Sequence, residues 1–547
     1  MKSQNIKYLA AFIIMLLLAF LQCYRAVHGL HWAFEPDFDR DIGYIRNTLN
    51  GHYGSDPNYI GEYMWYNPLL YLSEAAIVKI TGLPINIVVA RAGAFLNLLA
   101  PIFFFIMVRK LFDYKIALAA LLSFLFLASG NIPGWGGATY SPLPLANSYV
   151  QFIFYFNIFL CYKAFSTQKM RWFTILGIFL GIGFLGHAAP TIIIILMLIL
   201  LQGPKVIAAI KTKEYSSIKT YLLQGLFTLV PFLVFSFPFL YFVLIKYHLH
   251  FVNRIILQCA PGIFARANSI ELLKLNLTFP FVIAAIGFVM FCRKYNNPLI
   301  KKIILYWLYI TVFMYLYEAI LPTANRMLHI TLPDTIPALH YFFYLKGVQS
   351  VFFAFGFVYL VDLAIHWMEG YAAKRRLRKI PVLLSSNLFV IFVLLCAIIY
   401  YPIYSNRADF VVPRQQALAK EKETDKIEVY DFIVKNIPLN RVMLCKHDQS
   451  LFPVMATGIK MVSVEIYFSN PYVSYEQREN DRNEMLSYLV ASAPSPAEKL
   501  FLKYKVSYVL LPNNDFEQYK TPAFLTSNVI FTNKSFTIMS LTMAGNK

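Results

Sequence analysis

Four carboxylates lie within seven residues directly after the first apolar run of the chain, at Glu35, Asp37, Asp39 and Asp41. Like charges this close raise the pKa of at least one carboxyl group, which suits a general base that takes a proton from an attacking hydroxyl. Carboxylate oxygens are also the ligands that Mg²⁺ and Mn²⁺ prefer. We therefore predict the base among Asp39, Asp41 and Asp37, and we predict Asp39 and Asp41 as the ligands if a divalent cation is bound.

A structural role competes with this chemistry. Apolar residues at helical spacing predict an amphipathic helix over residues 40–50 on the membrane surface, and Gly51 would end it. Asp39 would then be the N-cap of the helix, and Asp41 would lie in its positively polarised first turn. A cap of this kind stabilises a helix by about 0.5–2 kcal/mol and needs no further function. The sequence leaves both interpretations open.

The composition of the chain is that of a membrane protein. Only 14% of its 547 residues are charged, 58% are hydrophobic, and the mean hydropathy is +0.54. About a quarter of the residues of a soluble domain are charged, so lipid is the expected solvent for most of this chain. The net charge of +20 does not indicate nucleic acid, because Lys and Arg fall mainly in short loops between apolar runs. We predict the lipid bilayer as a partner and no nucleic acid.

Apolar runs near the roughly 20 residues that cross a bilayer divide the chain up to residue 403. They are 8–24, 86–108, 115–130, 149–165, 172–186, 189–203, 221–246, 277–292, 303–321, 347–366 and 381–403. Basic residues gather in alternate loops, which places the N-terminus in the cytoplasm and everything after residue 403 outside. The predicted fold class is a polytopic α-helical membrane protein of about eleven transmembrane helices, N-in and C-out, in the cell inner (plasma) membrane.

The sequence predicts two domains. Residues 1–403 would form a transmembrane catalytic domain with the first outer loop at 28–84, and residues 404–547 a soluble periplasmic or extracellular α/β domain. In the second domain, helices are predicted at 427–437, 483–490 and 496–504, and strands at 442–445, 460–466 and 508–511. The six cysteines form no CxxC motif, so no zinc site or disulfide framework is predicted. Pairing of Cys259 with Cys445 is left open.

Three stretches of the first outer loop resemble the start of the GT-C glycosyltransferases, which include the protein mannosyltransferases and aminoarabinose transferases. They are residues 39–44 (DRDIGY), 49–51 (LNG) and 66–71 (YNPLLY). Asn67 stands where these enzymes often have proline, and Ile42 where many have glutamate. The second departure leaves the base among the aspartates unassigned. The resemblance covers about fifty residues, and beyond them it is a likeness of architecture.

The resemblance implies a multi-spanning glycosyltransferase that uses a polyprenyl-phosphate sugar donor. A hexosyl or pentosyl group would pass to a glycan, lipid or protein acceptor on the extracytoplasmic face. The acceptor hydroxyl would attack the anomeric carbon, an aspartate would take its proton, and the anomeric configuration would be inverted. The leaving phosphate would need cationic donors nearby.

Polar residues at the outer ends of the predicted spans are the candidates for binding substrate. They are Arg326, His329, His187, Arg254, Lys246, Tyr66 and Glu318. Arg326 is the first choice for the phosphate, because it follows an apolar span and precedes a loop with proline and histidine. Lys246 and Arg254 would equally snorkel to lipid headgroups. Glu318 is costly in lipid and is expected to face a cavity or a basic partner.

Three other functions compete with this one. A polysaccharide polymerase or ligase would also use a lipid-linked donor, and a large outer loop with several arginines would favour it. A transporter or flippase of lipid-linked sugars would need charged or broken helices at the membrane midplane, often in matched halves. The sequence shows no clear halves. In a membrane scaffold, the three aspartates would be replaceable by asparagine with little effect.

Overall fold

The computed structural model describes residues 2–34, 36–127, 139–253, 266–329, 337–374, 382–491 and 497–544. They form two compact units, which we name by their content. The membrane unit comprises Met1–His28, Arg91–Phe237 and Gly262–Val412, and the loop-and-tail unit comprises Gly29–Ala90, Pro238–Pro261 and Pro413–Lys547. The first outer loop therefore belongs to the same compact unit as the end of the chain. That residues 404–547 form a domain by themselves stays a prediction.

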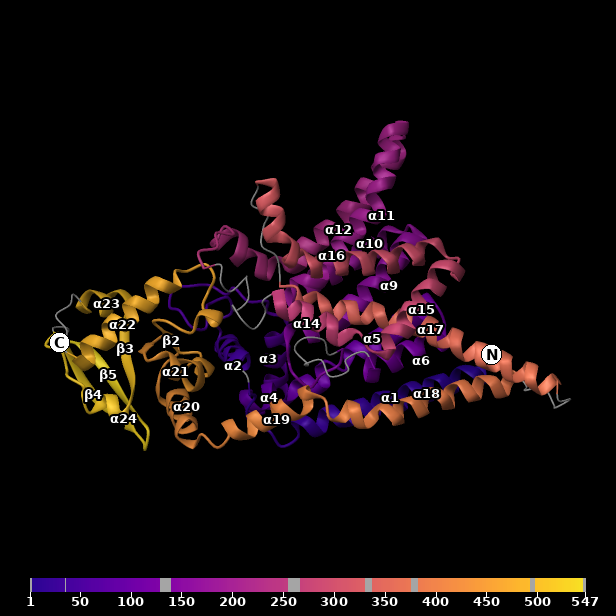
Figure 1. The fold of residues 1–547 in the computed structure, drawn as a ribbon. Helices are drawn as coiled ribbons and strands as arrows, with labels where there is room; N and C mark the ends of the chain where they lie inside the picture. The colour runs from indigo at the N-terminus through magenta and orange to yellow at the C-terminus, as the bar shows by residue number, and fades with distance from the viewer. Residues whose placement is uncertain are drawn as a thin grey trace. The chain divides into compact units, whose positions relative to one another are not determined.

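Helices make up the described part of the membrane unit (Figure 1). The longer ones are α1 Lys2–Val27, α5 Leu99–Leu111, α6 Tyr114–Leu122, α9 Gln151–Thr167, α10 Met170–Gly186, α11 Ala188–Thr212, α12 Tyr215–Leu240, α14 Arg266–Asn276, α15 Phe279–Lys294, α16 Pro298–Leu328, α17 Leu339–Lys374 and α18 Val382–Ser405. Helix α4, Ile85–Leu96, begins in the loop-and-tail unit, and α8 is a single turn, Ala146–Tyr149. Helices α1 and α18 lie side by side although they come from opposite ends of the unit (Figure 1).

Seven helices of the described chain are long and apolar enough to cross a membrane. Their bounds are Asn5–Val27, Ile85–Leu111, Ala188–Thr212, Tyr215–Lys246, Pro298–Glu318, Leu339–Met368 and Asn387–Lys420, and two shorter apolar helices are Tyr114–Leu127 and Met170–Gly186. A polytopic helical membrane protein is thus confirmed, whereas the number eleven is not. The predicted runs 149–165 and 277–292 do form helices, but α9 and α15 have only 17 and 16 residues.

Two glycines allow α15 and α17 to approach closely in the membrane unit. A Cβ atom on Gly287 would lie 1.7 Å from the carbonyl oxygen of Phe352, and one on Gly356 would lie 2.1 Å from the carbonyl oxygen of Ile283. In lipid, helices associate through such close backbone contact, because burial of apolar surface supplies little driving force between them.

A Gly287→Val variant is therefore expected to unfold at a lower temperature in detergent than the wild type, because the two backbones must separate. Overpacking of this kind costs about 1–3 kcal/mol or more. Gly203→Val is the matched control, since a Cβ atom on Gly203 of α11 would meet nothing within 4 Å. Equal unfolding temperatures for the two variants would contradict the close contact.

A five-stranded mixed sheet organises the loop-and-tail unit, and its strand order is β2-β1-β3-β5-β4. The strands are β1 Val442–Leu444, β2 Lys460–Met461, β3 Val506–Pro512, β4 Leu525–Thr532 and β5 Phe536–Met543. Strand β1 pairs in parallel with β2 and β3, and β5 pairs antiparallel with β3 and β4. Strands β3, β4 and β5 form the yellow sheet at the C-terminal end of the chain (Figure 1).

Two hydrophobic clusters cover the two faces of this sheet. Met443 belongs to one cluster, and its neighbours Val442 and Leu444 belong to the other, as the two-residue period of a strand requires. The first cluster includes residues of helix α20, Thr424–Asn436, and the second includes residues of α22, Tyr475–Ala491, and α23, Ala497–Tyr504. The small α/β layer predicted for the tail is present.

The first outer loop supplies part of this core. Tyr59 is buried in the first cluster, and its hydroxyl hydrogen bonds to the hydroxyl of Ser469 at 2.9 Å. The loop contains helix α2, Pro36–Leu49, and helix α3, Leu69–Thr81. Near the tail, helix α19, Ala408–Lys420, precedes α20, and the short helices α21, His447–Gln449, and α24, Asn513–Phe516, adjoin the sheet.

Several predicted elements of the tail have different bounds in the structure. The predicted helix 483–490 is the second half of α22, which begins at Tyr475. The predicted strand 460–466 reduces to the two residues of β2, and β4 and β5 were not predicted. Helix α19 was not predicted from the sequence.

Candidate active site

Helix α2 carries the three aspartates, and it begins earlier than the sequence indicated. Its first residue is Pro36, so Asp37 and Asp39 both lie in the first turn. The prediction that Asp39 is the N-cap is therefore wrong, because that position lies before the helix. The helix does end before Gly51, whose φ of 83° only glycine adopts readily.

Asp39 is buried against the lysine that ends helix α19. The ammonium group of Lys420 donates to both carboxylate oxygens, at 2.6 Å to Oδ1 and 2.8 Å to Oδ2. Burial raises the pKa of Asp39 to about 6, and the charge of Lys420 opposes that rise. The lysine also lies 4.4 Å from the centre of the Phe452 ring. With both oxygens held, Asp39 links the first outer loop to the last part of the chain.

Asp41 is also buried, with 4% of its surface exposed, but it is held through one oxygen. Arg40 donates to Oδ1 from Nε and from its terminal nitrogen, each at 3.0 Å. Among the described residues, every hydrogen bond recorded for this carboxylate involves Oδ1. Burial raises the pKa of Asp41 to about 6; Arg40 lowers it, and Asp37 raises it further. The contacts of Asp41 with Arg40 thus leave the second oxygen, Oδ2, outside this ion pair.

Arg40 is fixed in place by two further contacts. Its guanidinium lies 3.7 Å from the centre of the Tyr66 ring and 2.8 Å from Oδ1 of Asp37, whose side chain is 41% exposed. Because the guanidinium of Arg40 stacks on an aromatic ring and also contacts two carboxylates, its side chain has little freedom to rotate. Tyr66, predicted to bind substrate, thus supports the residue that orients Asp41.

Glu74 of helix α3 is the unexpected carboxylate of this site. It is fully buried, and neither of its oxygens has a hydrogen-bond partner among the residues that the structure describes. Burial raises its pKa well above the ordinary range, and the charge of Asp41 adds to the rise. Its helix packs on α2 through a parallel stack of Tyr71 on Tyr44, with ring centres 4.8 Å apart. This environment therefore favours the protonated, neutral form of Glu74 over its carboxylate.

A second buried network joins the first outer loop to the segment after α12 and to the tail. Asp56 accepts from the Asn58 amide at 2.7 Å and from Asn470 Nδ2 at 2.8 Å. Asn470 Nδ2 also lies 2.8 Å from the hydroxyl of Tyr247, whose ring stacks on Tyr472 at 4.2 Å. The polar segment around Asn470 therefore holds the unit together, which accounts for its buried side chain.

Lys246, predicted to bind substrate, lies at the edge of the loop-and-tail unit. Its side chain is exposed, and its ammonium lies 5.1 Å from the ring centre of Tyr63 and 5.6 Å from that of Tyr241. It is not in contact with the aspartates of α2. Arg254 lies outside the described residues, as does Cys259.

Four other predicted binding residues belong to the membrane unit. His187 lies between α10 and α11, with its ring centre 4.6 Å from that of His340. The backbone amide of Ala189 donates to its Nδ1 at 3.1 Å, so the neutral ring carries its proton on Nε2. Glu318 Oε2 accepts from the Ala338 amide at 2.8 Å.

Arg326 and His329 lie near the end of α16 and are exposed. They do not gather with the histidine pair into a group that could hold a metal, because the described residues contain no cluster of three metal-ligating side chains. Their predicted contact with the donor phosphate is untested.

Three residues of the site escaped the sequence analysis. Arg40 lies between two candidate aspartates, and its position there was the available signal. Lys420 is separated from Asp39 by 381 positions, and nothing local marks it. Glu74 lies outside the run of aspartates, and the packing of α3 on α2 buries it completely.

The carboxylates of α2 do not form a good cation site in this arrangement. Both oxygens of Asp39 face Lys420, and Oδ1 of Asp41 faces Arg40, so cationic side chains occupy the positions where a metal would bind. We therefore derive no step of the reaction through Mg²⁺ or Mn²⁺.

Comparison with known proteins identifies the fold. No family model and no curated protein matches the sequence. The structure resembles archaeal oligosaccharyltransferase AglB from Archaeoglobus fulgidus in complex with an inhibitory peptide and a dolichol-phosphate, with a TM-score of 0.54 and 14% identity over 92% of this chain and 69% of that one. It also resembles ArnT from Cupriavidus metallidurans bound to undecaprenyl phosphate, with a TM-score of 0.52 and 11% identity over 96% of this chain and 97% of that one. Both are GT-C glycosyltransferases, so the predicted GT-C fold is confirmed.

Proposed function

We propose that this protein is a membrane glycosyltransferase that moves a sugar from a polyprenyl-phosphate donor to an acceptor on the extracytoplasmic face. The observation that carries the proposal is Asp41, a buried carboxylate that Arg40 holds through a single oxygen. Support comes from the fold, because AglB was solved with a dolichol-phosphate and ArnT with undecaprenyl phosphate. The acceptor is a glycan, a lipid or a protein.

In the proposed reaction, the acceptor hydroxyl oxygen attacks the anomeric carbon while the bond from that carbon to the phosphate oxygen breaks. Oδ2 of Asp41 takes the hydroxyl proton, and polyprenyl phosphate leaves with its negative charge. A single displacement inverts the anomeric configuration. Arg40 positions Asp41, and burial of Glu74 disfavours a second negative charge beside it. Lys246, Arg326, His329, His187 and Arg254 are the candidates to contact the donor phosphate.

Helix α2 gives the two main aspartates different roles in this proposal. Asp39 has both oxygens bound to Lys420, so it is the structural member, and Asp41 is the base. The proposal thus selects Asp41 as the base from the three carboxylates that the sequence left open. The side chain of Asp37 is 41% exposed, and it serves Arg40 as a second anion.

The rate of transfer is expected to fall as pH falls below about 6. Only the carboxylate form of Asp41 can take a proton, and burial raises its pKa to about 6 from an ordinary 3.8. Below that pKa, kcat/KM should lose about tenfold per pH unit, as for a single essential base. A rate that stays constant from pH 7 to pH 5 would contradict the assignment.

Unfolding does not explain such a loss. Burial also raises the pKa values of Asp39 and Asp56 to about 6. When folding raises the pKa of a carboxyl group, the folded state binds its proton more tightly than the unfolded state does. The stability gained in this way is fully present below the pKa of the unfolded state and is lost as pH rises through the folded-state pKa of about 6. These groups therefore favour the folded state at pH 5 over pH 7, and thermal unfolding at the two pH values is the control.

The class of donor is tested with purified protein and labelled sugars. The proposal expects product from polyprenyl-phosphate sugars and none from nucleotide sugars. Turnover of a free nucleotide sugar alone would overturn it. Transfer of a long lipid-linked oligosaccharide instead of a single sugar would place the protein with the polysaccharide polymerases or ligases.

A further inference from the structure

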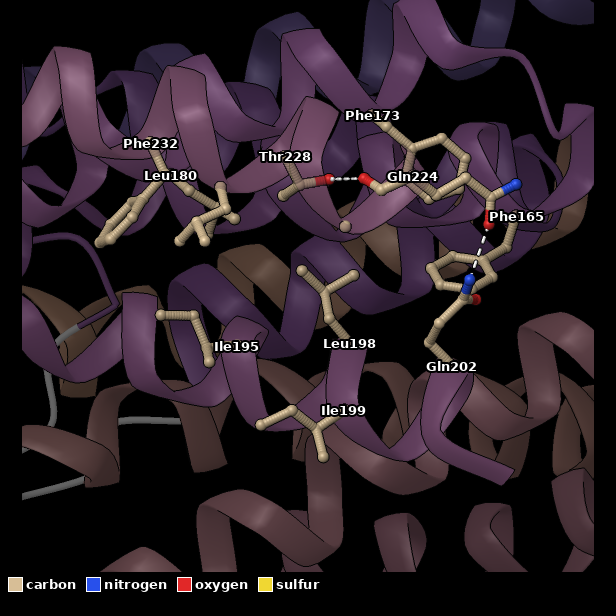
Figure 2. A pocket seen from close by; sticks show the side chains of 12 residues that line it. Phe165, Phe173, Leu180, Ile195, Leu198, Ile199, Gln202, Gln224, Thr228 and Phe232 are labelled. Atoms are coloured by element: carbon tan, nitrogen blue, oxygen red, sulfur yellow. Dashed lines mark hydrogen bonds between the residues drawn. The ribbon is translucent and has the colours of Figure 1, made fainter. Parts of the chain in front are cut away.

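An apolar groove opens between α9, α10, α11 and α12 of the membrane unit (Figure 2). Its volume is about 290 Å³, and its walls include Phe173, Leu180, Ile195, Leu198 and Phe232. Figure 2 shows these side chains on facing helices with their apolar ends toward the space. A hydrocarbon chain suits such walls, whereas a sugar would leave its hydroxyls without partners.

The groove lies at membrane depth. Helices α11 and α12 belong to two of the candidate spans, Ala188–Thr212 and Tyr215–Lys246. The outer surface of α12 is almost wholly apolar, with Leu226 and Leu233 exposed beside the groove. Because the hydrocarbon core of a membrane contains no water, an open apolar groove between membrane-spanning helices is filled by a lipid chain.

One end of the groove is polar and ordered. Gln202 Nε2 donates to Gln224 Oε1 at 2.7 Å, as Figure 2 shows, and Gln224 Nε2 donates to Gln168 Oε1 at 2.9 Å. The carbonyl oxygen Oε1 of Gln202 is buried and has no partner in the described part of the chain. Such an acceptor is costly to leave unpaired, so it points to a ligand with a hydroxyl or amide donor at this end.

The same end is basic. Lys205 lies 5.1 Å from the ring centre of Phe165, which lines the groove, and Lys169 precedes the first residue of α10. Arg171 follows within the first turn of that helix. The hydrogen bonds among Gln168, Gln202 and Gln224 join the C-terminal end of α9 to α11 and α12 at this point. The positive charges of Lys205 and Lys169 suit a lipid phosphate, and the apolar walls of the groove suit the hydrocarbon chain of the same lipid.

The basic end of the groove and His187 lie toward opposite ends of helix α10. Helix α10 has 17 residues and spans about 25 Å, with Lys169 before one end and His187 after the other. The basic end of the groove is therefore at the membrane face opposite His187. A donor whose phosphate lies at the His187 face cannot place that phosphate among these cations.

We infer that the groove binds one acyl chain of an anionic glycerophospholipid, with its phosphate at Lys205 and Lys169 and a headgroup or glycerol donor near Gln202. The lipid stabilises the packing of α12 on α10 and α11 from the leaflet opposite His187. This inference does not depend on the proposed function.

The test is native mass spectrometry of the purified full chain in detergent with added phosphatidylglycerol or phosphatidylcholine. The wild type should retain phosphatidylglycerol preferentially. Gly225→Leu should abolish that adduct, because Gly225 lines the groove and a Cβ there meets nothing within 4 Å, so the new side chain fills the space without a backbone clash. Gly203→Leu, whose Cβ is equally unobstructed but which does not line the groove, should bind as the wild type does.

A second pair of variants keeps the groove open. Lys205→Gln should lower the preference for phosphatidylglycerol about fivefold, the effect expected of one lysine at an anionic surface. Lys211→Gln, in the last turn of α11, should leave it unchanged. Equal lipid retention by wild type, Gly225→Leu and Lys205→Gln would overturn the inference. Displacement of phosphatidylglycerol by an equal concentration of polyprenyl phosphate would also overturn it, since the groove would then belong to the donor.

Discussion

Replacement of Asp41 by asparagine is expected to lower the rate of sugar transfer by about 10²–10⁴-fold, the usual contribution of a positioned base. Asparagine keeps the size of the side chain and an oxygen for Arg40, but it cannot accept the proton of the acceptor hydroxyl. The measurement is the initial rate at saturating donor at pH 7.5, with thermal unfolding in the same detergent to confirm that the variant is folded. Donor binding should change little, so the loss should fall on kcat.

The neighbouring carboxylates are the controls. Asp37→Asn removes an exposed partner of Arg40 and should change the rate only slightly. Glu74→Gln keeps the shape of the side chain, and burial raises the pKa of Glu74 and so favours its neutral form, so this variant should also retain activity. A folded Asp41→Asn variant with the activity of the wild type would show that the carboxylates of α2 serve structure alone, and the scaffold and transporter hypotheses would then lead.

A Lys420→Met variant is expected to lose about 3–5 kcal/mol of unfolding free energy, because it leaves the Asp39 carboxylate buried without its partner. Methionine keeps an apolar stem against Phe452, so the loss reports the missing charge more than the missing volume. The measurement is equilibrium or thermal unfolding in detergent. The double variant Asp39→Asn with Lys420→Met should recover most of the stability, since the uncompensated charge is then gone.

Lys426 provides the matched control for this prediction. Its ion pair with Glu423 is partly exposed, with oxygen and nitrogen 3.0 Å apart, and such pairs contribute about 0–1 kcal/mol. Lys426→Met should therefore unfold almost as the wild type does. If Lys420→Met also left the unfolding free energy almost unchanged, the ion pair between Asp39 of the first outer loop and Lys420 of helix α19 would not stabilise the protein as we expect.

Local patterns in the sequence predicted elements whose formation depends on neighbouring residues. The apolar spacing before Gly51 predicted helix α2, and this helix is present in the structure. The start of α2 was misplaced because acidic residues are favoured both at a cap and in the first turn. Charge alone cannot separate these two positions.

Strands that are buried on both faces could not be predicted from the sequence pattern. In strand β5, Phe536 and Ile538 face one hydrophobic cluster, and Met539 and Leu541 face the other. A strand covered on both faces shows no alternation of apolar and polar residues, so the pattern used to find strands is absent.

Non-local packing decided the chemistry of the site. The pairing of Asp39 with Lys420 and the burial of Glu74 depend on residues far apart in the sequence or on a neighbouring helix. Three aspartates that look equivalent in the sequence thereby acquire different environments: one is exposed, one is bound through both oxygens, and one is held through a single oxygen. That distinction could not be read from spacing.

The most direct test of the central claim uses a polyprenyl-phosphate sugar with tritium in the sugar and ³²P in the phosphate. We predict that purified wild-type protein in vesicles moves tritium into a new product while ³²P remains in polyprenyl phosphate, in equal amounts, and that Asp41→Asn does neither. Movement of both labels together across the membrane with the donor intact would identify a flippase instead. Transfer of ³²P with the sugar would contradict cleavage at the anomeric carbon, and with it the role assigned to Asp41.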